Sequence, residues 1–401
     1  MEAYLLEFGN LLLRWLHVVA AIAWIGESIY FVMLDNSLRP PQSEQDRKRG
    51  VFGEMWAVHG GGFYHNQKFL TSPSELPKDL HWAFWKAYTT WLSGFAIFAT
   101  LYLSKPTFYL VNPGADWAWV AALDGWQAGV IAVAFLLVGW IVYDQLCRRI
   151  SPNMDHDGIL SVAVAVMMII VSYLACQIFP GRAAFLITGA VMATCMSANV
   201  FFWIIPGQRR MVAALKVGQE PNALDGKRGK QRSVHNTYFT LPVVLLMLSN
   251  HYSFIYSGPN AWIILSLFII SGAAIRQYFV LRHSGLNKPV YPIVGVILLV
   301  VIAFLAAPKS GPVDRSEDSP GVTTAQVMQI MEARCVQCHA AKPTQPGFAA
   351  APAGMALETE QQVLAQPDLI KQVIANNYMP LGNLTKMTPE ERNAIAAWPG
   401  R

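Results

Sequence analysis

The chain has 401 residues, of which 54% are apolar and only 14% are charged. An average soluble domain is about 25% charged, so the composition excludes a disordered protein and argues against an ordinary soluble enzyme. The net charge of +5 is modest, and we expect no nucleic-acid partner. The apolar excess instead predicts segments that lie in a lipid bilayer.

Eight apolar runs are long enough to cross about 30 Å of hydrocarbon as helices. They cover residues 10–33, 82–104, 124–147, 159–179, 183–205, 236–256, 260–281 and 289–307. The sequence therefore predicts an all-α fold class, in which residues 1–307 form an eight-span transmembrane helical bundle with the catalytic groups.

The first span carries three ionisable residues, Arg14, His17 and Glu27. Ionisable side chains inside a membrane are costly, and each is a functional hypothesis by default. The second span adds Lys86 about one turn inside its start, at the same level as Glu27. A carboxylate and a lysine at one level are candidates for binding substrate or moving a proton.

Residues 51–70 (VFGEMWAVHGGGFYHNQKFL) are too polar to be a span, and three consecutive glycines break any helix there. Glycines let backbone N–H groups approach a ligand closely. The flanking aromatic, amide and cationic side chains suit a flat, polar, anionic heterocycle. The candidate substrate residues are His59, His65, Asn66, Gln67 and Lys68. An interfacial loop with membrane-anchoring aromatic residues is the alternative.

Two histidines flank the sixth span. His235 lies at its inner end, and His251 lies near its outer end. His17 and His251 both fall within about 10 Å of the outer surface at 1.5 Å per residue. Their level predicts a haem b held by His17 and His251, with two interfacial histidines bonded to neighbours as the alternative. His235 is a further substrate or catalytic candidate, and with His59, His65 or His81 it could hold a second haem b.

The composition changes abruptly after the last span. Residues 308–322 are rich in proline, glycine, serine and charge, which predicts a flexible linker. Residues 323–401 form a polar tail in which Thr323 and Thr388 each have the sequence of a helix-capping box. The tail is therefore expected to be a separate helical domain.

This tail contains Cys335-Val-Gln-Cys338-His339, the C-x-x-C-H pattern of haem c attachment. Two thiols one helical turn apart can each bond to a vinyl group of one porphyrin, and the adjacent histidine then coordinates the iron. Met379, in a Met-Pro unit, is the expected sixth ligand. No second cysteine pair exists to complete a zinc site. The tail resembles a class I cytochrome c with one covalent haem, whose metal ligands are His339 and Met379.

Lysine and arginine residues are distributed unevenly between the two sides. Segments 34–81, 148–149, 206–235 and 282–288 carry 17 of them, whereas the opposite-side segments before the tail carry two. Cytoplasmic loops are enriched in these residues. The N-terminus and the tail are therefore expected outside the cytoplasm, which agrees with extracytoplasmic attachment of haem c.

The segments HGGGFYHNQKF, WKAYTTWLSGF and HNTYFTLPVVLLMLSNHY, together with CVQCH and YMPLGN in the tail, resemble the bacterial membrane-bound, cytochrome c-linked urate oxidases, or urate hydroxylases. The resemblance covers essentially the whole chain. It implies a multi-pass protein of the bacterial inner membrane, with a periplasmic tail, that oxidises urate to 5-hydroxyisourate without making hydrogen peroxide. It also implies that electrons leave through the haem c to the respiratory chain, with a soluble cytochrome c or a terminal oxidase as acceptor.

Two other functions remain open. The stretch WLHVVAAIAWIG is similar to the first helix of haem-binding membrane protoporphyrinogen oxidases, in which a histidine on that helix and a lysine on a later helix are important. His17 and Lys86 match them, which keeps open a haem-dependent membrane dehydrogenase for a porphyrinogen or a quinol. The other is a membrane-anchored electron-transfer cytochrome, although an anchor needs only one span.

The side on which substrate binds decides how electrons must travel. From a cytoplasmic site they would have to cross most of the bilayer to a haem outside, so an intramembrane carrier is expected. A substrate pocket that opens outward needs no such carrier.

Overall fold

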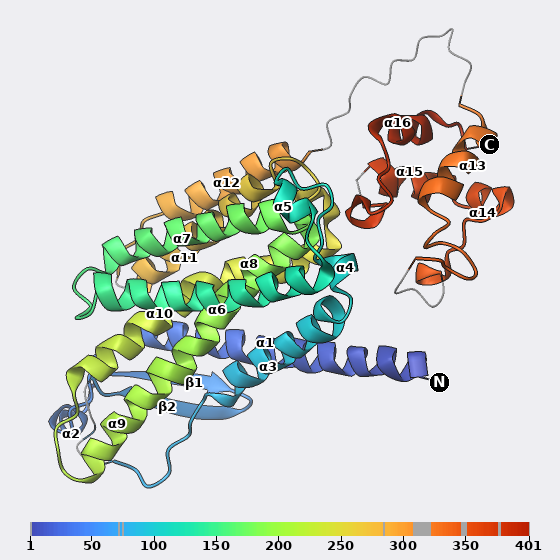
Figure 1. Ribbon diagram of the computed structural model, residues 1–401. Coiled ribbons are helices and arrows are strands. Elements are labelled where there is room, and N and C mark those ends of the chain that lie inside the picture. Colours follow the sequence, from blue (N-terminus) through green and yellow to red (C-terminus); the bar gives the residue numbers. More distant parts are fainter. Residues whose placement is uncertain are drawn as a thin grey trace.

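The computed structural model describes residues 2–70, 73, 76–283, 285–307, 322–345, 351–375 and 378–400. The chain is mostly helical, and Figure 1 shows a bundle of long helices with a smaller group of helices beyond one end. Apart from its last residue, the predicted linker 308–322 lies outside the described residues.

The elements before the middle of the bundle are α1 (Glu2–Ser37), α2 (Glu44–Lys48), β1 (Gly53–His59), β2 (Gly62–Lys68), α3 (Trp85–Phe98), the π-helical η1 (Ala99–Leu103), α4 (Pro106–Tyr109) and α5 (Ala118–Ala121). The rest of the bundle consists of α6 (Gly125–Ile150), α7 (Asp157–Ile178), α8 (Gly181–Ala198), the π-helical η2 (Asn199–Ile204), α9 (Ile205–Lys216), α10 (Ala223–Leu248), the short 3-10 turns η3 (Ser249–His251) and η4 (Ser253–Ile255), α11 (Ala261–His283) and α12 (Val290–Ala306). The tail contains α13 (Thr324–Arg334), η5 (Pro352–Gly354), α14 (Glu360–Leu364), α15 (Pro367–Ala375), η6 (Leu381–Asn383) and α16 (Pro389–Ala397).

Each predicted span coincides with a helix, but the helices differ in length and polarity. Five stretches are long and apolar enough to cross a membrane: Tyr4–Ser37, Gly125–Ile150, Asp157–Ile178, Gly181–Lys216 and Ala261–Arg282. These stretches are compatible with a multi-pass membrane protein. Helix α12 is shorter, at 17 residues, and the other two predicted spans correspond to α3 with η1 and to α10.

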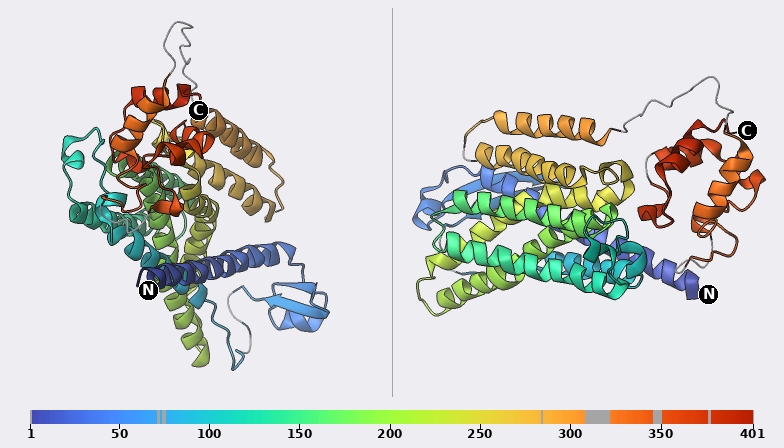
Figure 2. Two further views of the ribbon diagram at one scale, coloured as in Figure 1. Left: turned by 90° about the vertical axis from the view of Figure 1, so that its right-hand side faces the viewer. Right: turned by 45° about the horizontal axis from the view of Figure 1, so that its top comes forward.

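The two ends of the bundle carry different elements. The N-terminus of α1, helices α4 and α5, and the tail lie at one end, here named the tail end (Figures 1 and 2). The β1–β2 strands and α9 lie at the other, here named the hairpin end (Figure 1). The N-terminus and the tail therefore share one end, as the distribution of basic residues predicted.

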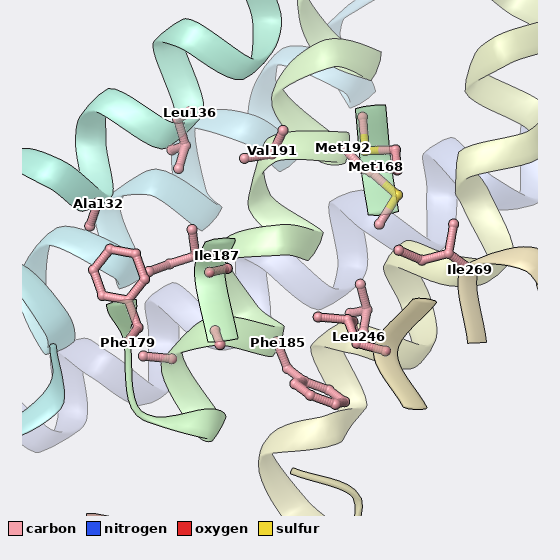
Figure 3. Packing of buried hydrophobic residues seen from close by; sticks show 14 of the residues in the cluster. Ala132, Leu136, Met168, Phe179, Phe185, Ile187, Val191, Met192, Leu246 and Ile269 are labelled. Carbon is pink, nitrogen blue, oxygen red and sulfur yellow. The ribbon is translucent and has the colours of Figure 1, made fainter. Parts of the chain in front are cut away.

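The core of the bundle surrounds α8, most of which is buried, whereas α1 leaves most of its apolar side chains exposed. Figure 3 shows α8 residues such as Ile187 and Val191 meeting side chains of α6, α7, α10 and α11. Glycines allow this close approach, because a Cβ at Gly139 would lie 2.6 Å from Val191 and one at Gly189 would lie 3.0 Å from Leu246. Small residues at such crossings are how membrane helices pack tightly.

The all-helical prediction is wrong for residues 53–68, which form an antiparallel β-hairpin. Gly60 and Gly61 at its turn have φ of +57° and +83°, a conformation that glycine adopts without strain and that tight hairpins require. The segment is not a span, as expected, because its glycines favour a turn. The backbones of Arg39 and Glu54 pair with each other and tie the hairpin to the chain that follows α1.

The sixth span differs in its boundaries from the prediction. Helix α10 already begins at Ala223, where the Asn222 side chain accepts a hydrogen bond from the Leu224 amide (3.0 Å). The basic segment 206–235 is therefore mostly the helical pair α9 and α10 rather than a loop. The helix ends at Leu248, so His251 lies in the 3-10 turn η3 outside the helix.

The tail has a hydrophobic core of its own, which includes Val327, Met331, Ile395 and Trp398. Both predicted capping boxes are formed, by Thr323 at α13 and by Thr388 at α16. Each cap satisfies orphan N–H groups of a first turn and so fixes where its helix starts. The tail thus packs around a core of its own.

Candidate functional site

The cysteine and histidine motif of the tail lies at the end of α13. Cys335 caps this helix, and its carbonyl accepts hydrogen bonds from the amides of Cys338 (3.1 Å) and His339 (2.9 Å). This tight turn brings both thiols and the imidazole to one place. Burial raises the pKa of the Cys335 thiol to about 12, so the free thiol is neutral at pH 7.

The imidazole of His339 is held by the backbone of a later segment of the tail. Its Nδ1 lies 2.9 Å from the carbonyl oxygen of Met355. A hydrogen bond to a backbone carbonyl fixes the ring and its tautomer, which leaves Nε2 free to coordinate a metal. Among the described residues, no three His, Cys, Asp or Glu side chains gather as a metal site.

Of three candidate methionines in the tail, Met387 is only 3% exposed and belongs to the core, whereas Met355 and Met379 are both partly buried against it. Met379 stands in the Met-Pro unit that the sequence indicates. Met379 is partly buried against the same core as Cys335, and its carbonyl accepts a hydrogen bond from Arg392 (2.9 Å). The donor set Cys335, Cys338, His339 and Met379 therefore fits a haem c.

The structure brings Glu27 and Lys86 together. The Lys86 ammonium lies 2.7 Å from the Glu27 carboxylate, between α1 and α3 at the hairpin end, and both side chains are partly buried. Such a pair can hold a proton between its partners or bind a polar ligand that separates them.

His17 of α1 also contacts α3. Its Nδ1 lies 3.0 Å from the carbonyl oxygen of Thr90 and 3.1 Å from the Ser93 hydroxyl. A Cβ at Gly94 would lie 2.8 Å from the imidazole, so the ring fits only because Gly94 has no side chain. This orientation again leaves Nε2 available for a haem iron. His251, its proposed partner, is exposed in η3.

The substrate candidates of residues 59–68 are divided between the two faces of the hairpin. Alternate residues of a strand point to opposite faces, so His65 and Gln67 share one face while Asn66 and Lys68 share the other. His65 stacks on Trp56 with ring centroids 4.2 Å apart. These residues therefore do not converge on a single ligand.

The hairpin side chains have partners of their own. The Nε2 of His65 lies 2.9 Å from the Glu54 carboxylate, and Lys68 lies 2.7 Å from that of Asp35. His59 is exposed at the turn. The amide nitrogen of Asn66 is buried, and no described residue accepts a hydrogen bond from it.

His235 lies apart from the hairpin, in a buried polar network between α6, η2 and α10. Its Nδ1 is 2.8 Å from the Tyr143 hydroxyl. The Asn199 amide donates to that hydroxyl and to the Asn236 side chain, each at 2.9 Å. A cavity of about 340 Å³, lined by His235, Gln231, Asp157 and lysines, lies beside this network.

A buried ion pair continues the network. The guanidinium of Arg232 lies 2.9 Å from the Asp144 carboxylate, and both side chains are nearly inaccessible to solvent. Asp144 also binds Arg148, four residues on in the same helix, and accepts a hydrogen bond from the Trp203 indole, both at 2.7 Å. Sequence reasoning missed Arg232 because it counted it among loop residues. Its spacing of three from His235 was the available signal, since positions three apart share one face of a helix.

We expect the Glu27–Lys86 contact to contribute to the free energy of unfolding of the protein. In a double-mutant cycle of Glu27→Gln and Lys86→Met, the coupling energy should be about 1–2 kcal/mol, because each partner is only partly shielded from solvent. Unfolding of the purified protein in mild detergent measures it. Lys78→Met, at an exposed lysine, is the matched control, and additive single effects would contradict the contact.

The fold and these sites define a helical, multi-pass membrane protein with ionisable groups between its helices and a histidine and cysteine centre in its tail. Comparison with protein families then gives the particular family. Residues 3–307 match the model described as urate oxidase N-terminal, so the chain belongs to this urate oxidase-related family of oxidoreductases. No curated protein and no solved structure matches the chain.

Proposed function

We propose that the protein is a membrane-bound urate oxidase that converts urate to 5-hydroxyisourate and passes the electrons through its own haem c. The observation that carries the proposal is the family match over residues 3–307 in a chain whose tail presents Cys335, Cys338 and His339. The reaction consumes one water and releases two electrons and two protons per urate. Hydrogen peroxide is not a product, because the electrons leave to a respiratory acceptor rather than to oxygen.

In the proposal, the tail binds one haem c, which supplies a one-electron acceptor when bound. Cys335 and Cys338 hold the porphyrin, and His339 and Met379 coordinate the iron. Arg392 positions Met379 through its carbonyl, and Met355 orients His339. A soluble cytochrome c or a terminal oxidase then takes the electrons one at a time.

The proposed function also includes all eight predicted spans and their orientation in the membrane. The eight helices span the bacterial inner membrane, with the tail end in the periplasm and the hairpin end in the cytoplasm. One haem b between His17 and His251 is supported by the orientation of His17, whose Nδ1 is held by α3. A second haem b at His235 has less support, because that imidazole already serves the Tyr143 hydroxyl.

Two regions offer groups that could hold urate and deprotonate water. One is the hairpin end, where the residues proposed from the sequence are distributed over separate contacts: Glu27 with Lys86, His65 with Glu54, and His235 with Tyr143. The other is a cavity at the tail end that Arg182 helps to line. A haem-dependent dehydrogenase for a quinol or a porphyrinogen is the second candidate function, and the His17 and Lys86 positions favour it.

The experiment that tests the proposal adds urate to the oxidised full-length protein without oxygen. We expect the absorption bands of reduced haem c to appear, with two haem equivalents reduced per urate consumed and no hydrogen peroxide formed on re-oxidation by a respiratory acceptor. A quinol and a porphyrinogen, added separately, are the competing donors. Reduction by one of these but not by urate would replace the proposal with the dehydrogenase.

A further inference from the structure

A cavity lies where the tail meets the tail end of the bundle. Its volume is about 710 Å³, within the range of roughly 300–1,000 Å³ typical of small-molecule sites. Both parts of the protein line it. The bundle contributes residues around α4, the start of α8 and the start of α11, while the tail contributes the segment around Met379.

The lining combines three kinds of group that recognise a flat, polar anion. Aromatic rings include Phe108, Phe179, Tyr256 and Trp262, and the side-chain amides are Asn112, Gln177 and Asn383. The charged lining residues are Arg182, Arg392 and Asp116, so the cavity carries one excess positive charge. Rings stack on a planar heterocycle, amides hydrogen-bond its edges, and arginine pairs with its negative charge.

Arg182 is the cation best placed to bind a ligand. Its Nε donates to the Asn250 side chain (3.2 Å), and its guanidinium lies 5.9 Å from the centre of the Tyr109 ring. No carboxylate of the described residues forms an ion pair with it, so its charge is available to an anion. Arg182 also stands in the first turn of α8, where the helix dipole favours negative charge.

A second observation indicates that the cavity holds a ligand or ordered water. The hydroxyl of Tyr256, a lining residue, is buried and has no hydrogen-bond partner among the described residues. Buried polar groups are almost always hydrogen-bonded, and each exception needs an explanation. A bound molecule that reaches this hydroxyl would provide one.

The tail places the segment around Met379, the residue that would coordinate the proposed haem, next to this cavity. Tyr378 and Leu381, which flank the Met379-Pro380 unit, line it, and the lining residue Arg392 donates to the Met379 carbonyl. A molecule oxidised in the cavity would therefore lie close to the sixth-ligand side of the haem. Electrons from this position would not have to cross the bilayer.

We propose that this cavity between the tail and the bundle is the binding site for the urate anion, with Arg182 pairing with its charge. The inference rests on the proposed function. Urate plus one water gives 5-hydroxyisourate, two protons and two electrons, and the electrons pass singly to the oxidised haem c, which the respiratory acceptor re-oxidises. Because the site opens on the tail side, no carrier at the hairpin end is required.

The test measures binding of labelled urate to the full-length, haem-loaded protein with the haem kept reduced, so that no turnover occurs. Arg182→Gln should raise the Kd for urate by about 10-fold or more, because a hydrogen bond to a charged group is lost. Tyr256→Phe removes only an unpartnered hydroxyl and should raise the Kd by a smaller factor without weakening the fold. Arg149→Gln, an exposed arginine at the hairpin end, is the control with the same charge change.

Each outcome bears on the proposal. An unchanged Kd in both Arg182→Gln and Tyr256→Phe would overturn the site while leaving the proposed function intact. The same holds if Lys86→Met raises the Kd and Arg182→Gln does not, because urate would then bind at the hairpin end. Conversely, Arg182-dependent binding without haem reduction on oxidised protein would preserve the anion site and overturn the proposed function. Absence of urate binding to the unaltered protein would overturn the site.

Discussion

A chain in which Cys335 and Cys338 are both replaced by serine is expected to lose its covalently bound haem completely, and with it all transfer of electrons from urate to an external acceptor. Serine hydroxyls do not form the thioether bonds that hold the porphyrin, and both thiols sit at the same turn as His339. Haem staining after denaturing electrophoresis and a pyridine haemochrome spectrum measure the covalent haem. Oxidation of urate with a cytochrome c acceptor measures the transfer.

Two methionine variants test the sixth ligand of this centre, one at the proposed ligand and one as its matched control. Met379→Leu should keep the covalent haem but lower its reduction potential, because a thioether sixth ligand raises the potential. Met387→Leu, a buried core residue of the same type, should leave the spectrum and the potential unchanged. Covalent haem in the double serine variant, or an axial-ligand change caused by Met387→Leu, would contradict the assignment.

The second large effect is expected at the ion pair between Asp144 and Arg232. Asp144→Leu should lower the free energy of unfolding by about 3–5 kcal/mol, because it leaves a buried guanidinium without its carboxylate. The Asn199 side chain, at 3.5 Å, and the rings of Tyr143 and Trp203 then remain near Arg232, and none of them carries a negative charge. Reversible unfolding of the purified protein in detergent measures the change.

Replacing Arg232 should lower the free energy of unfolding by less than replacing Asp144. In Arg232→Met the carboxylate keeps its bonds to Arg148 and to the Trp203 indole. The double variant Asp144→Leu with Arg232→Met should be more stable than Asp144→Leu alone, since no unpaired charge stays buried. Arg149→Met, at an exposed position near the end of α6, is the control. Equal costs for the two single variants would refute this account of the pair.

The sequence predicted best those features that depend on local chemistry. The caps at Thr323 and Thr388 were readable because a side chain meets the backbone three residues away. Glu27 and Lys86 were placed at one level from the sequence, and their contact agrees with that placement. The family match agrees with the resemblance seen in the motifs of the bundle.

The features that sequence reasoning missed depend on packing between distant segments. The residues around the glycines looked like one binding set, yet pairing of β1 with β2 sends Asn66 and His65 to opposite faces. Arg232 counted as a loop cation, but α10 extends inward and carries it into the core. Likewise, nothing in the sequence indicated that Arg182 and Arg392, more than 200 positions apart, would line one cavity.

The π-helical turn η2 is a place in the helix that runs from α8 to α9 where one residue can be deleted without disturbing the packing of the flanking segments. A π-helical turn is equivalent to one extra residue inserted in an α-helix, so removing one residue there restores a regular helix and leaves α9 in its present orientation. Elsewhere in α8 a deletion would rotate the rest of the helix by about 100° and expose its buried face. Relatives that are one residue shorter at Asn199–Ile204 should therefore keep the packing on both sides of the turn, while losing the geometry that brings Asn199 to Tyr143.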